Sequence, residues 1–193
     1  MPVIVEDIKL DYNDVLIRPK RSVLTSRKDV DLTRRFKFPN SGATWEGVPI
    51  IAANMDTIGT FGMYKVFSKH KILCALHKYY TADDYEEFAK ETCGLDPNYF
   101  MVSTGISDSD FDRLCDICSR IDVKFICIDV ANGYMETLVQ FCLKCRKMFP
   151  NKILVAGNVV SRELTEDLIL RGKVDIVKVG IGPGSACTTR SQT

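Results

Sequence analysis

Six short apolar segments recur along this chain at intervals of 23 to 28 residues, and this rhythm restricts the possible folds more than any other feature of the sequence. Each segment lacks strict alternation of apolar and polar residues and is bounded by turn residues, which is typical of a short buried strand. The six predicted strands cover residues 49–53, 72–76, 100–103, 125–130, 153–156 and 176–180.

Helical patterns separate these strands. They are predicted at residues 61–70, behind the capping-box sequence Thr81-x-x-Asp84, over two cysteine-bearing segments near 111–121 and 138–149, and at residues 161–171. Strand–helix alternation at this period predicts parallel βαβ units that share one sheet.

Polar residues follow nearly every predicted strand. They are Asn54 and Asp56, His77 and Lys78, Ser103 and Thr104, Asp129 and Asn132, Asn158, and the loop from Gly182 to Cys187. In a (β/α)₈ TIM barrel the carboxyl ends of all strands face one shared site, which explains such a distribution. A doubly wound sheet gathers its ligand at one switch point behind a glycine-rich first loop, and this sequence has no G-x-G-x-x-G there. The barrel is therefore the predicted fold.

The length makes this barrel incomplete. The 193 residues hold about six of the eight βα units that a closed barrel of about 250 residues needs. We expect one catalytic barrel domain over residues 1–193, with a polar, irregular N-terminal arm over 1–46, extended near 30–33, and βα units over 47–193. The C-terminal part of the barrel is expected to lie beyond this sequence.

Composition is typical of an ordinary globular protein. The 26 Lys and Arg residues nearly balance the 25 Asp and Glu residues, so the charge suggests neither a nucleic acid nor a membrane surface as partner. The longest uncharged stretches are too short for a transmembrane helix, and the N-terminus does not read as a signal peptide. The eight cysteines are then expected to be reduced thiols of a cytoplasmic protein.

Two Cys-x-x-Cys pairs are the first candidates for a metal or redox site. Cys115 and Cys118 share a helical spacing with Phe111, Leu114 and Ile121. The second pair, Cys142 and Cys145, shares a helical spacing with Leu138, Phe141, Met148 and Phe149. Buried cysteine behaves as a small apolar residue, so helix packing is the favoured interpretation. A zinc or dithiol protein is the alternative.

The loop from Gly180 to Arg190 carries the strongest chemical signal. Its glycines permit backbone turns closed to other residues, and Cys187 is expected to be exposed near Arg190. These conditions favour a thiolate nucleophile. The amides around Ser185 are suited to a phosphate and the loop carbonyls to a monovalent cation. A glycine-rich turn with an incidental cysteine is the alternative.

Two further residues are candidates from their positions alone. Lys78 either pairs with an anionic ligand or is a solvated loop lysine, and the adjacent His77 is interpreted as structural. Asp129 ends an otherwise apolar strand, where burial of an acid is costly unless it has a role. The alternative for Asp129 is a cap on the following turn.

Several motifs occur in a fixed order from about residue 8 to residue 193. They are Asp-Tyr-Asn-Asp14-Val-Leu-Ile-Arg-Pro, Val-Asp-Leu-Thr-Arg, Ile-Ala-Ala-Asn54-Met-Asp56-Thr, Asp129-Val-Ala-Asn-Gly-Tyr, Ala-Gly-Asn158-Val-Val and Lys-Val-Gly-Ile-Gly-Pro-Gly-Ser-Ala-Cys187-Thr-Thr-Arg. Together they resemble the motifs of the GMP reductase family and, less closely, those of the related IMP dehydrogenases. The short connection after Lys78 and the form Pro-Gly-Ser-x-Cys-Thr-Thr-Arg resemble the reductase more closely than the dehydrogenase.

The resemblance implies that GMP is reduced by NADPH to IMP and ammonia through a purine adduct on Cys187, with Thr189 assisting proton transfer. Positions that match NADPH contacts of the family are Ser26, Arg27, Lys78, Asp129, Val130, Ala131, Ile181 and Gly182. Positions that match its potassium loop are Gly182, Gly184, Cys187 and Arg190, and Ser185 matches a nucleotide contact. The family further implies a homotetramer and a catalytic glutamate beyond Thr193, so this chain alone is expected to be inactive.

Three other functions stay open at this point. An IMP dehydrogenase would share the cysteine adduct and pass hydride to NAD⁺. A truncated, non-catalytic member of the family would bind full-length subunits through the open edge of the barrel. A zinc or thiol-redox protein would use the Cys-x-x-Cys pairs.

Overall fold

The structure realises the predicted alternation of strands and helices in the larger of two units. The computed structural model describes residues 8, 10, 12–92, 94–184 and 186–189. The chain divides into the units Met1–Asp31 and Leu32–Thr193. Within the first unit, the 3-10 helices η1 and η2 cover Tyr12–Asp14 and Arg27–Asp29.

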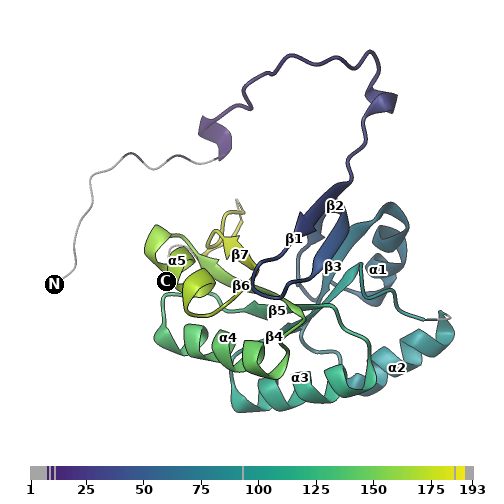
Figure 1. Cartoon of the computed structure of the whole chain (residues 1–193), viewed down its shortest axis with the longest axis vertical. Helices are drawn as coiled ribbons and strands as arrows, with labels where there is room; N and C mark the ends of the chain where they lie inside the picture. The colour runs from purple at the N-terminus through teal and green to yellow at the C-terminus, as the bar shows by residue number, and fades with distance from the viewer. Residues whose placement is uncertain (1–7, 9, 11, 93, 185, 190–193) are drawn as a thin grey trace. The chain divides into compact units, whose positions relative to one another are not determined.

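A seven-stranded sheet forms the centre of the second unit (Figure 1). Its strands are β1 (Arg34–Lys37), β2 (Thr44–Ala52), β3 (Ile72–Leu76), β4 (Phe100–Thr104), β5 (Phe125–Asp129), β6 (Ile153–Val159) and β7 (Ile176–Val179). β1 pairs with β2 in the antiparallel direction, and every later pair is parallel. The strands lie in the sheet in the same order as in the sequence.

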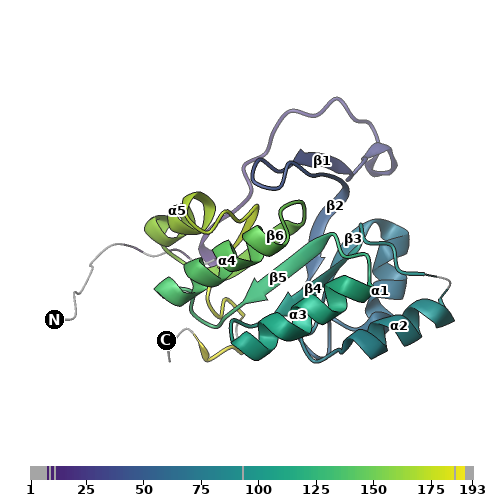
Figure 2. The same cartoon turned by 60° about the horizontal axis from the view of Figure 1, so that its bottom comes forward.

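Helices cover one face of this sheet (Figure 2). They are α1 (Phe61–Phe67), followed by the 3-10 helix η3 (Ser68–His70), α2 (Ala82–Glu91), α3 (Asp108–Arg120), α4 (Glu136–Met148) and α5 (Arg162–Leu170). A doubly wound sheet reverses its strand order and carries helices on both faces, whereas sequential order with helices on one face is the arrangement of a barrel wall. The predicted barrel, incomplete in this chain, is therefore confirmed. None of these described helices is both long and apolar enough to cross a membrane.

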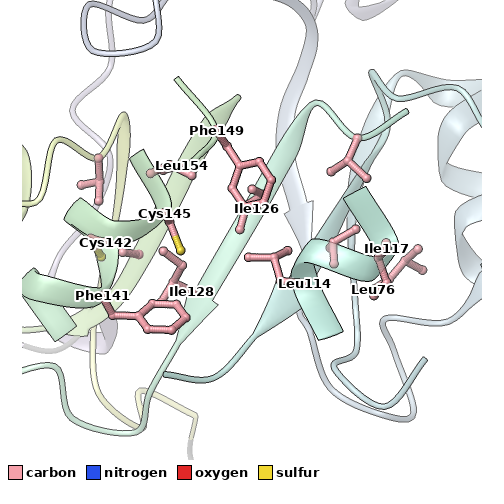
Figure 3. Packing of buried hydrophobic residues seen from close by; sticks show 14 of the residues in the cluster. Leu76, Leu114, Ile117, Ile126, Ile128, Phe141, Cys142, Cys145, Phe149 and Leu154 are labelled. Carbon is pink, nitrogen blue, oxygen red and sulfur yellow. The ribbon is translucent and has the colours of Figure 1, made fainter. Parts of the chain in front are cut away.

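Both faces of the parallel strands are apolar, which explains why the sequence segments lack alternation. On the helix side, Leu114 of α3 and Phe141 of α4 pack against Ile126 and Ile128 of β5 (Figure 3). On the opposite face a second cluster joins β3 to β6 with the hairpin β1–β2. Its buried members are Phe38, Trp45, Leu73, Ala75, Met101, Phe125, Cys127, Ile153 and Val155.

Five of the six predicted strands match the observed ones to within three residues at either end, and the strand at 72–76 coincides with β3. The N-terminal arm needs correction. Residues 34–37 form β1 and β2 already begins at residue 44, so the arm is not irregular throughout. Val30 has the extended backbone that the sequence predicts for its segment. The β1 side chains are all exposed, so no apolar pattern marks this strand, and backbone pairing with β2 holds it in place.

The cysteine pairs lie on helices, as the packing interpretation predicts. Cys142 and Cys145 are fully buried beneath α4, and Cys115 and Cys118 on α3 pack against the same core. The prediction is wrong for one residue of the buried face of α4: Met148 is 56% exposed, whereas Cys145 and Phe149 on either side of it are buried.

Candidate active site

A hollow of about 310 Å³ lies where the strands β2 to β5 end. Its lining residues are Asn54, Met55, Asp56, Lys78, Tyr79, Ser103, Thr104 and Asp129. Most of the polar residues that follow the first four predicted strands are among them. The structure therefore brings them together at one edge of the sheet, as parallel strands of a barrel require.

Asp129 belongs to a closed polar network and does not cap the following turn. Its Oδ2 accepts a 2.9 Å hydrogen bond from Nδ2 of Asn54, and its Oδ1 forms an ion pair with the ammonium of Lys178. Nζ of Lys178 also donates to Oδ1 of Asn54 at 3.1 Å. The three side chains connect the end of β2 with β5 and β7, which are far apart in the sequence.

Lys178 is a site residue that sequence reasoning missed. It lies within the apolar segment Ile-Val-Lys178-Val of β7, and its ammonium faces the inner side of the sheet. The only signal for it in the sequence is a charged residue in the middle of a predicted buried strand, since burial of an unpaired ammonium is costly.

Lys78 and His77 follow β3 and have different environments. Lys78 is exposed and lines the hollow, with its ammonium 5.9 Å from the ring centre of Tyr79. The ring of His77 stacks on Tyr80 with 3.9 Å between ring centres, and its Nδ1 accepts a hydrogen bond from the backbone N–H of Tyr79. His77 is thus held by its neighbours, as the structural interpretation predicts.

The predicted catalytic pair lies on the loop after β7. The thiol of Cys187 donates to Oγ1 of Thr189 over 3.4 Å, and Cys187 is exposed as predicted. The backbone N–H of Cys187 donates to the carbonyl of Gly184 at 3.0 Å. Gly180 and Gly182 both adopt positive φ angles, of 126° and 54°, so this loop needs glycine at these two positions.

The inner layer beneath the hollow holds two further polar groups. Ser103 pairs with Cys127 across β4 and β5, and its hydroxyl is buried. Burial raises the pKa of the Cys127 thiol to about 11, although the nearby Lys178 ammonium acts in the opposite direction. Cys127 is therefore a neutral packing residue at physiological pH.

The remaining predicted residues are distributed over both units. Val130 exchanges backbone hydrogen bonds with Gly157 and Asn158 of the neighbouring strand, and Ala131 is exposed beside it. Ile181, Gly182 and Gly184 lie in the loop after β7. Ser185 and Arg190 lie outside the described residues.

Ser26 and Arg27 belong to the unit Met1–Asp31. There, Oγ of Ser26 accepts a hydrogen bond from the backbone N–H of Lys28 and caps the 3-10 helix that contains Arg27. Their predicted contacts with a cofactor stay predictions.

Comparison with known proteins connects this site to a family. Residues 9–193 match the sequence profile described as "IMP dehydrogenase / GMP reductase domain". The chain is 56% identical to a GMP reductase of Klebsiella pneumoniae subsp. pneumoniae and 53% identical to one of Aliivibrio salmonicida, in each case over 97% of this chain and 54% of the relative. It thus spans about half the length of these curated relatives.

A solved structure extends the similarity to the fold. The crystal structure of inosine 5' monophosphate dehydrogenase from Legionella pneumophila superposes with a TM-score of 0.78 at 28% identity, covering 95% of this chain and 54% of the other. Since the family profile matches nearly the whole sequence, this chain belongs to the IMP dehydrogenase / GMP reductase family.

Proposed function

We propose that this chain forms the N-terminal part of a GMP reductase and supplies its cysteine nucleophile. The observation that carries the proposal is the contact between the Cys187 thiol and the Thr189 hydroxyl on a loop with two positive-φ glycines, at the carboxyl end of a barrel strand. Identity of 52 to 56% to GMP reductases, against 28% to the dehydrogenase structure, supports the reductase within the family.

The proposed reaction converts GMP, NADPH and two protons to IMP, ammonium and NADP⁺. Sγ of Cys187, as thiolate, bonds to C2 of the purine while the C2–N bond to the amino group breaks and ammonia leaves with a proton that Thr189 helps to deliver. A hydride then bonds to C2, the C2–S bond breaks, and the thiolate is regenerated. Two such steps replace one difficult displacement.

The residues of the hollow fit part of NADPH. The exposed Lys78 ammonium suits a phosphate, and the Asp129 carboxylate suits hydroxyl or amide donors. When bound, NADPH supplies the hydride. The carbonyls of Gly182, Gly184 and Cys187 are proposed to hold a monovalent cation such as potassium, and the working enzyme is proposed to be a homo-oligomer.

The test is an assay of the natural polypeptide after its intact mass has been measured. GMP-dependent consumption of NADPH with release of ammonia is expected from the active protein. Cys187→Ala should lower turnover by about a thousandfold or more, and Thr189→Ala by about a hundredfold. Cys115→Ala is the matched control, because this thiol lies on α3 away from the site, and it should keep full activity.

The results can also contradict the proposal. Full activity in Cys187→Ala would exclude the cysteine adduct. Oxidation of IMP with NAD⁺, without ammonia release from GMP, would assign the chain to the dehydrogenases instead.

A further inference from the structure

Asp129 and Lys178 lie in one rung of the sheet, separated by a glycine. Asp129 of β5 pairs with Gly157 of β6, and Gly157 pairs with Lys178 of β7. Residues paired in register project their side chains to the same face. Since Gly157 has no side chain, nothing from β6 stands between the carboxylate and the ammonium.

The glycine is required by close packing. A Cβ atom at Gly157 would lie 2.5 Å from both Cβ and the carbonyl oxygen of Lys178. The approach of β7 to β6 at this rung therefore depends on the absence of a side chain, and the same absence lets Lys178 reach Asp129.

Within this network, the carboxylate of Asp129 can still accept hydrogen bonds from a ligand. Each carboxylate oxygen of Asp129 already accepts one bond, from Asn54 or from Lys178, and each can accept one more. The side chains of Lys178 and Asp129 are 29% and 30% exposed, so the ion pair is partly shielded from water.

We propose that Lys178 is a positioning residue of the cofactor site, which neutralises and orients Asp129 so that this carboxylate can accept hydrogen bonds from a polyanionic dinucleotide. The inference rests on the proposed function, in which NADPH occupies the hollow. A dinucleotide phosphate carries several negative charges, and an uncompensated carboxylate in a partly buried site repels them. With Lys178 in place, the ion pair has no net charge. The remaining lone pairs of the Asp129 carboxylate then suit ribose hydroxyl or carboxamide N–H donors.

A purely structural role makes a different prediction. If Lys178 only links β7 to β5, removal of Asp129 in addition to Lys178 does not restore ligand binding. If Lys178 neutralises Asp129, the second substitution removes the uncompensated charge and improves binding. The order of affinities among the variants therefore separates the two roles.

The experiment titrates NADPH, followed by its fluorescence, into four forms of the natural polypeptide: unaltered, Lys178→Met, Asp129→Asn and the double variant. Lys178→Met should weaken NADPH binding by about tenfold or more. The double variant should bind more tightly than Lys178→Met and within about threefold of Asp129→Asn. Unchanged affinity in Lys178→Met, or a double variant no better than Lys178→Met, would overturn the proposal.

A second measurement separates this inference from the proposed function. Thermal unfolding of the same four proteins without ligand should show a lower Tm for Lys178→Met and a partial recovery in the double variant, because the unpaired carboxylate is gone. If the unaltered protein binds no NADPH, the proposed function fails, and the unfolding series still decides whether Lys178 neutralises Asp129. If the loss of Tm in the double variant equals the sum of the losses in Lys178→Met and Asp129→Asn, the inference is overturned.

Discussion

Arg146 donates a 2.6 Å hydrogen bond from its guanidinium to the carboxylate of Asp175, and this ion pair ties α4 to the start of β7. The Asp175 side chain is fully buried and that of Arg146 is 10% exposed. The same carboxylate accepts hydrogen bonds from the hydroxyl and backbone N–H of Ser41 in the β1–β2 turn. The remaining Arg146 donors reach the carbonyls of Phe149, Pro150, Lys152 and Lys173.

Arg146→Met should destabilise the protein by about 3–5 kcal/mol, because it leaves a buried carboxylate without its cation. The matched control is Arg162→Met, which breaks a surface pair with Glu166 and should cost under about 1 kcal/mol. Urea unfolding followed by far-UV circular dichroism measures both. Equal losses in the two variants would contradict a special role for the buried pair.

Thr81→Ala should cost about 1 kcal/mol at pH 7, since it removes the hydroxyl that accepts the backbone N–H of Asp84 at the start of α2. Hydrogen bonds from the Thr81 backbone N–H and hydroxyl hold the pKa of Asp84 below its usual value. A carboxyl group whose pKa is lower in the folded than in the unfolded state stabilises the protein at pH values above the unfolded-state pKa. This stabilisation is lost as the pH falls through the folded-state pKa.

The difference in unfolding free energy between the native protein and Thr81→Ala should therefore narrow below about pH 4. Urea unfolding of both proteins at neutral and acidic pH checks this. A difference that stays constant down to pH 2 would mean that the Thr81–Asp84 contact contributes no charge-dependent stability.

Alkylation should distinguish the exposed Cys187 thiol from the described thiols that pack into the core. Burial raises the pKa of Cys118 to about 11 and that of Cys145 to about 12, so at pH 8 only about one Cys118 thiol in a thousand is ionised. Iodoacetamide should modify the exposed Cys187 before Cys118 and Cys145, and peptide mass spectrometry measures the order. The Cys118 rate should rise about tenfold per pH unit up to its pKa. Equal rates at pH 8 would contradict the packing role of the helix thiols.

Gly157→Ala should destabilise the protein by about 1–3 kcal/mol, because the new Cβ meets the Lys178 backbone and β7 must shift. Gly62→Ala in α1 is the matched control. Its Cβ would meet nothing closer than Oγ1 of Thr60 at 3.8 Å, so it should be neutral or stabilise the protein by up to about 1 kcal/mol. Thermal unfolding of both variants tests the difference, and a Gly157→Ala protein as stable as the control would refute the close approach.

Much of the fold is predictable because its signals are local. The capping sequence at Thr81 and Asp84 marks the start of α2 without reference to any distant residue, and the apolar segment at 72–76 coincides with β3. The strand β1 is not predictable in this way, because its side chains are all exposed and only its pairing with β2 defines it.

Local patterns in the sequence are enough to predict the alternation of the parallel strands and helices and the edge of the sheet at which polar residues such as Lys78 and Asp129 collect. They do not contain the contacts that these residues make. Lys178 meets Asp129, 49 residues earlier in the chain, because strand register aligns both with Gly157. Register depends on hydrogen bonds between strands that are distant in sequence, so no local pattern contains it.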